Sequence, residues 1–265
     1  MNPPEIVAEL IPRALQATEQ GNTGDAVSLY RRIVELEPEN DIARNNLGCL
    51  LLEAERIDEA VAVLEGAPED APPRDLRQNL AYALFSQGEP ERAERIFRGI
   101  LEEAPENGDA RNHLGMILLR TNRAQEAVEE FLRVTREHPE NVEAWNNLGC
   151  AWLGLGDLPR ARRNFEEALR VDPYSVDAHN NLGCVLRREG RLDEAIDELT
   201  VAVHLEPANP SIHLNLALGY RSSGQPRRAL SHLRRHLRLG ARGSETNEIR
   251  SMLRELEEHG KEGMT

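Results

Sequence analysis

The 265-residue chain is 29% charged and only 4% aromatic, and its formal net charge is −14. This acidic balance argues against nucleic-acid binding, because neutralising phosphate groups requires a basic surface. No apolar run approaches the roughly eighteen residues of a membrane-spanning helix, so we expect no membrane insertion. The first residues show no targeting or lipidation pattern, and three cysteines imply no disulfide framework. We therefore expect a cytoplasmic location.

A pentapeptide, Asn-Asn-Leu-Gly-Cys, occurs three times and begins at Asn45, Asn146 and Asn180. The last two copies begin 34 residues apart, and the first begins 101 residues before the second, one short of three such steps. A fixed period in the thirties is typical of a solenoid, in which one small structural unit is stacked many times. Alignment on this period gives seven repeats: 7–40, 41–73, 74–107, 108–141, 142–175, 176–209 and 210–243.

Each repeat predicts two amphipathic helices that are joined by a short turn. Repeat positions 4, 7, 8 and 11 share one face of a first helix, and positions 20, 24 and 27 share one face of a second. Small residues at positions 8 and 20 allow the two helices to approach closely. A glycine is expected to end the first helix in the left-handed conformation, and proline is expected to begin or stop the second. These glycines and prolines are Gly21, Gly88, Gly156, Gly190 and Gly224 at the turn, Pro90, Pro159 and Pro226 near the start of the second helix, and Pro38, Pro105, Pro139, Pro173 and Pro207 after its end.

The fifth repeat has the clearest pattern. Its residues at positions 4, 7, 8, 11, 15, 20, 24, 27 and 32 are Trp145, Leu148, Gly149, Trp152, Gly156, Ala161, Phe165, Ala168 and Pro173. This pattern resembles the tetratricopeptide repeat, whose signature residues occupy these positions. The resemblance covers about nine-tenths of the chain and implies an all-α fold, a right-handed α-solenoid of helix-turn-helix repeats.

The two ends of the chain lie outside the seven repeats. Residues 1–6 form a lead-in, and the first repeat is the least regular. After the last repeat, Ser244 or Thr246 can cap a further helix over residues 244–259. Its apolar residues follow helical spacing, and its other face is charged, as a terminal cap exposed to water requires. Residues 260–265 are a tail. The apolar residues of the capping helix are Ile249, Met252, Leu253 and Leu256.

Asparagines recur on the face of the first helix that we expect to line a concave groove. They resemble the asparagine ladder of the O-linked N-acetylglucosamine transferase repeats, which implies that they grip the backbone of an extended peptide. An amide can do so because it offers both a donor and an acceptor. The alternative is that they satisfy neighbouring backbone groups or contacts between repeats. The predicted peptide-binding residues are Asn46, Asn79, Asn147, Asn181 and Asn215 at position 6, and Asn45, Asn112, Asn146 and Asn180 at position 5.

Two further features of this face bear on binding. Tyr82 and Phe85 in the third repeat are a candidate aromatic anchor, although Phe85 can instead pack against its neighbouring helix. Acidic residues recur at position 2, whereas basic residues stand further along the same wall, so the groove can orient a peptide by charge. The acidic residues are Asp75, Asp109, Glu143 and Asp177, and the basic ones are Arg187, Arg188 and Arg221.

The seventh repeat, residues 210–243, has seven arginines and no acidic residue. These arginines either form a docking patch for an acidic partner or pair with the acidic helix that follows. The candidate patch is Arg227, Arg228, Arg234, Arg235 and Arg238, and the acidic residues of the following helix are Glu245, Glu248, Glu255, Glu257 and Glu258.

No catalytic motif or metal-ligand cluster is present in the sequence. His232 and His236 are four residues apart, but no third ligand accompanies them, so we interpret both as structural. We predict a non-catalytic scaffold, without cofactor or metal, that binds an extended peptide of a partner protein. One alternative is a substrate-recruiting subunit of a separately encoded transferase. A second, a co-chaperone-type clamp for a C-terminal carboxylate, is less favoured because position 5 holds Asn or Gln instead of Lys.

Overall fold

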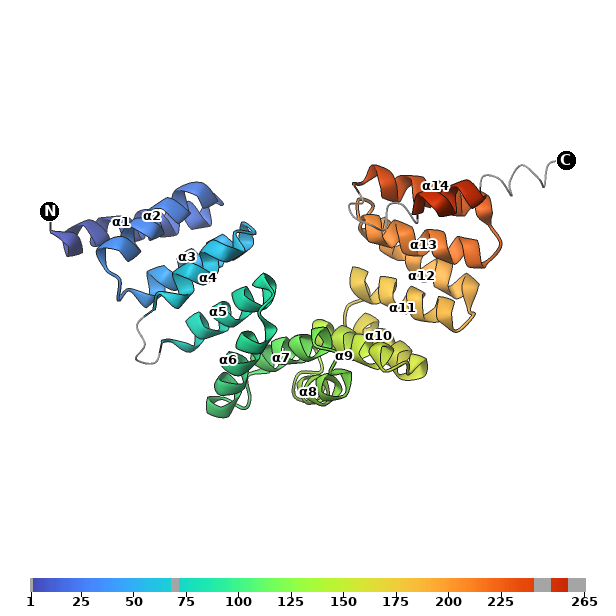
Figure 1. Cartoon of the computed structure of the whole chain (residues 1–265), viewed down its shortest axis with the longest axis horizontal. Coiled ribbons are helices and arrows are strands. Elements are labelled where there is room, and N and C mark those ends of the chain that lie inside the picture. Colours follow the sequence, from blue (N-terminus) through green and yellow to red (C-terminus); the bar gives the residue numbers. More distant parts are fainter. Residues whose placement is uncertain (1, 68–71, 241–248, 257–265) are drawn as a thin grey trace. The chain divides into compact units, whose positions relative to one another are not determined.

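The computed structural model describes residues 2–67, 72–240 and 249–256. The chain divides into two compact units, Met1–Arg123 (the N-terminal unit) and Ala124–Thr265 (the C-terminal unit). The all-α prediction is confirmed, since the described residues form helices and no strand. Figure 1 shows the helices in chain order. Those of the N-terminal unit are α1 (Pro3–Glu19), α2 (Thr23–Leu36), α3 (Asp41–Glu53), α4 (Ile57–Glu65), α5 (Arg74–Gln87), α6 (Pro90–Glu103) and α7 (Gly108–Arg120).

The C-terminal unit continues the same alternation of helices. Residues 249–256 form one further helix, which follows α14 along the chain. None of the helices in the described part of the chain is long and apolar enough to cross a membrane. The labelled helices are α8 (Ala124–Glu137), α9 (Val142–Gly154), α10 (Leu158–Val171), α11 (Val176–Arg188), α12 (Leu192–Leu205), α13 (Pro210–Ser222) and α14 (Pro226–Arg238).

Within each unit the odd-numbered helices form a layer of their own. Helix α3 packs against α5 and α5 against α7, and in the C-terminal unit α9 packs against α11 and α11 against α13. The even-numbered helices touch their sequence neighbours but not one another. In a curved stack of helix pairs, the helices of the inner wall lie closer to one another than the helices of the outer wall. The odd-numbered helices therefore line the concave side of each unit, as the repeat pattern predicts.

Glycines at repeat position 8 set the distance between the two helices of a pair. A Cβ added at Gly149 would lie 2.5 Å from Cε1 of Phe165, and one added at Gly183 would lie 2.5 Å from Cγ of Leu199. Both partners are fully buried. Because protein interiors are packed at crystal density, no space remains there for even one methyl group. The small residue at this position is therefore required by packing.

The turn inside each repeat uses one left-handed residue. The five glycines predicted there have φ between +69° and +97°. The second and fourth repeats have no glycine at this position, yet Glu55 (φ +57°) and Asn122 (φ +62°) adopt the same conformation. Left-handed backbone disfavours residues with a Cβ, and Asn tolerates it better than Glu. The turn geometry is thus imposed by the repeat, and Glu55 carries the backbone strain.

Side chains at repeat position 4 tie five of the repeats to the preceding one. They donate hydrogen bonds to the carbonyl oxygen of the proline six residues earlier, which follows the preceding even-numbered helix. Such a bond satisfies a polar group that the end of a helix leaves without a partner. The donor is Arg, Trp or His, depending on the repeat, whereas the acceptor is a proline carbonyl oxygen in every case. The bonds are Arg44 Nη2 to Pro38 (2.6 Å), Arg111 Nη2 to Pro105, Trp145 Nε1 to Pro139 (2.9 Å), His179 Nε2 to Pro173 (3.0 Å) and His213 Nε2 to Pro207 (3.1 Å).

The two ends of the chain are closed by helices. Helix α1 begins at Pro3 inside the predicted lead-in, with Asn2 and Glu5 forming a reciprocal capping box. At the other end, Ile249 is buried against Ala217 and Leu233, and the remaining three predicted apolar residues of the 249–256 helix pack beside it. The predicted caps Ser244 and Thr246, four of the five predicted glutamates, and the tail 260–265 lie outside the described residues.

Candidate functional site

The paired asparagines of the pentapeptide form hydrogen-bonded rungs between successive odd-numbered helices. In three rungs, a position-6 amide donates to the position-5 amide oxygen of the preceding repeat. The doublet Asn180–Asn181 uses both of its amides in this way, since Asn181 donates backward and Asn180 accepts from the next odd-numbered helix. The rungs are Asn79 Nδ2 to Asn45 Oδ1 (2.8 Å) in the N-terminal unit, and Asn181 Nδ2 to Asn146 Oδ1 (3.0 Å) and Asn215 Nδ2 to Asn180 Oδ1 (2.8 Å) in the C-terminal unit.

A rung leaves hydrogen-bonding groups available on both of its amides. The rung uses one N–H of the donor and the oxygen of the acceptor, whereas an Asn side chain has two N–H groups and one oxygen. Within the described residues, Oδ1 of Asn79, Asn181 and Asn215 has no protein partner, and none of these atoms is buried. Each rung therefore presents an accessible acceptor and accessible N–H groups on the concave side.

The remaining predicted asparagines are less accessible or differently bonded. Asn112 is 3% exposed, so it presents little surface to a ligand. Asn46 donates to the hydroxyl of Tyr30 at 3.2 Å instead of forming a rung, since position 5 of the first repeat is Ile11. Asn147 is half-buried on α9. In the third repeat Gln78 stands at position 5 and accepts from Asn107 at 3.4 Å.

The three cysteines lie beside the rungs and are free thiols. Asn79 also approaches Cys49 Sγ at 3.1 Å, and Asn181 approaches Cys150 Sγ at 3.7 Å. Burial raises the pKa of all three thiols, and it raises the pKa of Cys150 to about 11. A thiol with a raised pKa is poorly nucleophilic. They fill space next to the amides.

The N-terminal unit carries an aromatic cluster on the same wall. The Tyr82 side chain is 41% exposed and meets the ring of His113 edge-on, with centroids 5.6 Å apart. His113 stacks on Phe97 and donates from Nδ1 to the carbonyl oxygen of Asp109 at 2.8 Å. Phe85 is half-buried, and the guanidinium of Arg120 lies 4.4 Å above its ring. The two predicted anchors thus differ: Tyr82 faces solvent, whereas Phe85 packs against α7.

A histidine pair joins α13 to α14 in the C-terminal unit. Nδ1 of His213 and Nδ1 of His232 are 3.0 Å apart, and His213 Nε2 donates to the carbonyl of Pro207. Because that carbonyl only accepts, neutral His213 has a bare Nδ1, so His232 donates from its own Nδ1. Burial and the neighbouring His213 lower the pKa of His232. The four-residue spacing of His232 and His236 gave no hint of this partner.

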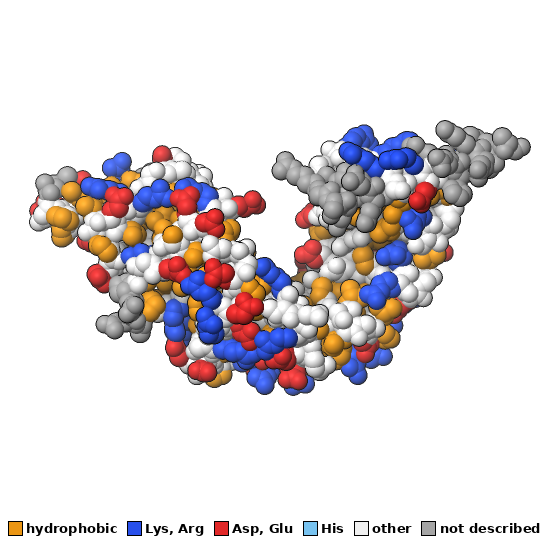
Figure 2. All heavy atoms as spheres, viewed as in Figure 1, with side chains coloured by type: hydrophobic (Ala, Val, Ile, Leu, Met, Phe, Trp, Pro, Cys, Tyr) orange, Lys and Arg blue, Asp and Glu red, His pale blue; other side chains and the backbone are white. Residues whose placement is uncertain are grey.

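Arginines gather over α14, where basic side chains are visible in Figure 2. All five arginines of the predicted docking patch are exposed. Arg228 donates to Gln225 Oε1 at 2.9 Å and lies above the ring of Tyr220. Of the acidic residues expected to pair with this patch, only Glu255 belongs to the described part of the chain.

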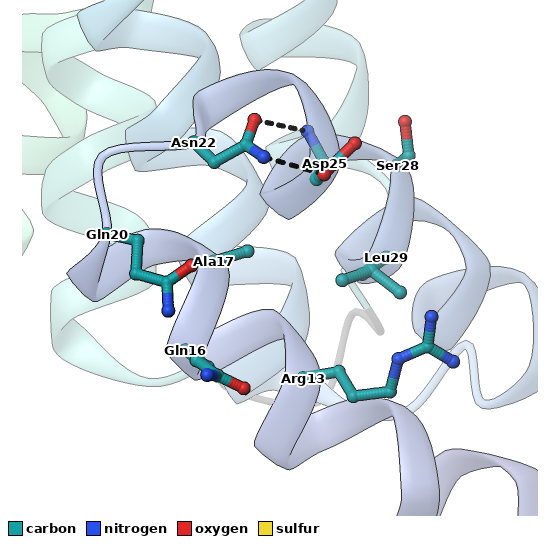
Figure 3. Close-up of a pocket in the computed structure, with 8 residues that line it drawn as sticks. All are labelled: Arg13, Gln16, Ala17, Gln20, Asn22, Asp25, Ser28 and Leu29. Carbon is teal, nitrogen blue, oxygen red and sulfur yellow. Dashed lines mark hydrogen bonds between the residues drawn. The ribbon is translucent and has the colours of Figure 1, made fainter.

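A separate polar hollow of about 390 Å³ lies between α1 and α2 (Figure 3). Its Asn22 and Asp25 bond to each other at the start of α2, with Asn22 Nδ2 donating to Asp25 Oδ2 at 2.6 Å. Arg13, Gln16 and Gln20 line the opposite side from α1 and are exposed. No group of three or more metal-ligating side chains is present among residues 2–67, 72–240 and 249–256.

Family models match most of the chain. Residues 73–263 match the model of the cilia and flagella-associated protein 70 C-terminal domain, and residues 17–83 match a tetratricopeptide-repeat model. No curated protein matches the chain.

Solved structures share the fold at low sequence identity. A tetratricopeptide-repeat protein from Parabacteroides merdae ATCC 43184 is 16% identical, with a TM-score of 0.78 over 95% of this chain and 99% of that chain. A chain of the APC/C hetero-tetramer Cut9–Hcn1 is 19% identical, with a TM-score of 0.75 over 92% of this chain and 48% of that chain. A thermophilic repeat protein from Thermus thermophilus is 23% identical, with a TM-score of 0.59 over 69% of this chain and 98% of that chain. These likenesses confirm the helical-repeat solenoid.

Proposed function

The chain belongs to the tetratricopeptide-repeat family of protein–protein interaction scaffolds, and from this we propose that it binds an extended segment of a partner protein along its amide rungs. The scaffold acts by binding and performs no chemistry of its own. The observation that carries this proposal is that each rung keeps an accessible oxygen and accessible N–H groups. A peptide unit offers the complementary N–H and C=O.

The spacing of the rungs fits an extended chain. Packed helices lie about 8–10 Å apart, and an extended peptide advances about 3.3 Å per residue. Successive odd-numbered helices would therefore meet every third residue of the ligand. Each amide contact is expected to add only about 0.5–1.5 kcal/mol, so affinity comes from several rungs used together. This mode of binding reads the ligand backbone and leaves side-chain selection to other groups.

The test uses peptides selected from a random twelve-residue library displayed on phage, with the immobilised full chain as bait. We expect the double variant N181A/N215A to bind a selected, fluorescently labelled peptide about tenfold more weakly, in line with two lost hydrogen bonds. Asn164→Ala is the matched control, since Asn164 lies on α10 and bonds to the carbonyl of Arg160. N-methylation of single peptide bonds in the ligand should weaken binding without any change of side chain. Unchanged affinity for both the double variant and the N-methylated peptides would exclude backbone recognition.

The arginines of α14 are a second candidate docking surface. The observation that favours it is that Arg228, Arg235 and Arg238 are exposed and form no ion pair within the described chain. An acidic partner would associate faster through such a patch and more slowly at high salt. The variant R228Q/R235Q/R238Q tests it: slower association with the natural partner supports docking there, and an unchanged rate excludes it.

A further inference from the structure

We infer that the concave wall of the C-terminal unit selects partner segments that carry side-chain carboxylates, which makes its natural ligand an acidic extended peptide. The inference rests on the proposed function and names the chemistry of its ligand. The basic groups that carry it are Arg187, Arg188 and Arg221, which we call the groove arginines.

The groove arginines stand beside the amide rungs. Arg187 and Arg188 occupy the last turn of α11, and Arg221 occupies the last turn of α13. Helices α11 and α13 pack against each other on the concave side. On α11, side chains three or four residues apart share a face, so Asn180, Cys184 and these two arginines form one stripe. A ligand that bonds to the Asn180–Asn215 rung would lie next to them.

Two arginines on the outer surface of the same unit have carboxylate partners. Arg162 meets Glu166 at 2.7 Å, and Arg191 meets Glu194 at 2.5 Å. The side chains of the groove arginines, by contrast, form no ion pair or hydrogen bond with any described residue. Their positive charge is therefore available to a ligand that lies against this wall.

Arg187 is the most informative of the three. Its Nε is buried and has no hydrogen-bond partner. Four other described arginines have a buried Nε without a hydrogen-bond partner, but each donates a hydrogen bond through another nitrogen; they are Arg44, Arg77, Arg111 and Arg162. A buried donor without a partner is costly, and a carboxylate would satisfy the guanidinium with two parallel bonds.

A simpler explanation is that these arginines stabilise helix ends. Positive charge near the last carbonyls of a helix is favourable, and all three occupy last turns. However, α9 ends in the same unit with no basic residue in its last turn. The helix end therefore does not demand arginine. The two explanations also separate experimentally, because a helix-end role changes stability and leaves ligand choice unaffected.

The experiment compares peptide selection by the full chain and by two variants of equal charge. R187Q/R188Q/R221Q removes the groove arginines, and R160Q/R163Q/R170Q removes three exposed arginines from the outer helix α10. Peptides selected from the random library by the natural chain should be rich in Asp and Glu, spaced about three residues apart to match adjacent helices. A selected peptide should bind the groove variant about tenfold more weakly and the α10 variant with unchanged affinity.

Three results would overturn the inference: selected peptides without acidic enrichment, an equal loss of affinity in both arginine variants, or a single-stranded oligonucleotide that displaces the peptide at lower concentration. Failure of the proposed function is distinguishable. If N181A/N215A loses binding while the groove variant retains it, the wall binds peptides without acidic preference. If the opposite holds, charge recognition stands and backbone recognition by the rungs fails. Thermal unfolding of each variant checks that the fold is intact.

Discussion

On the concave wall of the N-terminal unit, the rung between Asn45 and Asn79 is followed by an aromatic cluster around Tyr82. The C-terminal unit instead has two rungs within its odd-numbered helices, with unpaired arginines at the helix ends. The buried positions show no such difference, since small residues and leucines recur in both units. Packing thus constrains the positions that carry the repeat. Positions that face the groove are free to differ, and those positions define what each unit can bind.

The largest expected effect tests the packing positions. Gly149→Ala in the C-terminal unit places a methyl group 2.5 Å from the buried ring of Phe165, and such overpacking costs about 1–3 kcal/mol. Gly99→Ala in the N-terminal unit is the control, because nothing lies within 4 Å of its added Cβ. As a helix-interior glycine, Gly99 should give a gain of about 0.5–1 kcal/mol on substitution. Urea unfolding of the full chain measures both. If both substitutions changed the free energy of unfolding in the same direction, packing at Gly149 would not explain the result.

The next effect tests whether the rungs of the two units are equivalent. Asn79→Ala and Asn215→Ala each remove one amide hydrogen bond of 2.8 Å between neighbouring helices. Each should lower the free energy of unfolding by about 0.5–1.5 kcal/mol. The double-mutant cycle Asn215→Ala with Asn180→Ala should show that the two costs are not additive, because both remove the same bond. Additive costs would mean that the amides act separately.

A smaller effect compares the turn residue in the two units. Glu55 in the N-terminal unit holds φ at +57°, whereas Gly156 holds the same turn position in the C-terminal unit. Glu55→Gly should stabilise the chain by about 0.5–1 kcal/mol, since it relieves the left-handed strain. Gly156→Ala should destabilise by a similar amount, although nothing lies near its Cβ. A stabilising Gly156→Ala, seen as a raised unfolding midpoint, would show that the turn relaxes freely.

The smallest effect is a pH dependence confined to the histidine pair. The pKa of His232 is lowered from 6.5, so the folded state prefers the neutral ring. The stabilisation is fully present above pH 6.5 and declines as the pH falls through the lowered pKa. The melting temperature should therefore fall between pH 7.5 and 5.5, and His232→Phe should reduce that fall.

His204→Phe is the matched control for this pH dependence, since exposed His204 bonds only within its own helix α12. It should leave the change in melting temperature between the two pH values as it is in the natural chain. If the melting temperature of His232→Phe fell between pH 7.5 and 5.5 as much as that of the natural chain, the histidine pair would not cause the pH dependence.

Much of the fold could be predicted because its signals are local and periodic. The prolines after each second helix, the left-handed glycines and the small position-8 residues act within one repeat, and seven copies make the register clear. The strained Glu55 is the informative exception. A glutamate at a glycine position suggests a different turn, but the stacked helices on both sides hold the backbone in the left-handed conformation.

The candidate site was less predictable, because its hydrogen bonds join residues about 34 positions apart. Asn181 was predicted as a groove residue, but its bond to Asn146 depends on how two helices are rotated against each other. One signal was available: adjacent asparagines in successive repeats bring position 6 of one next to position 5 of the other. A second signal was a side chain with an N–H donor that recurs six residues after the proline that follows each second helix. The last of these donors along the chain is His213.

By itself, the sequence determined the family and the helical hairpins, because periodic burial and turn chemistry depend on near neighbours along the chain. Only the tertiary structure decided which polar groups pair with one another and which are left for a ligand. The amide rungs and the His213–His232 pair depend on side chains from different helices meeting within about 3 Å, and the groove arginines are those that no partner meets at that distance. That distance is set by how helices of neighbouring repeats pack against each other, and the sequence of one repeat does not specify this packing.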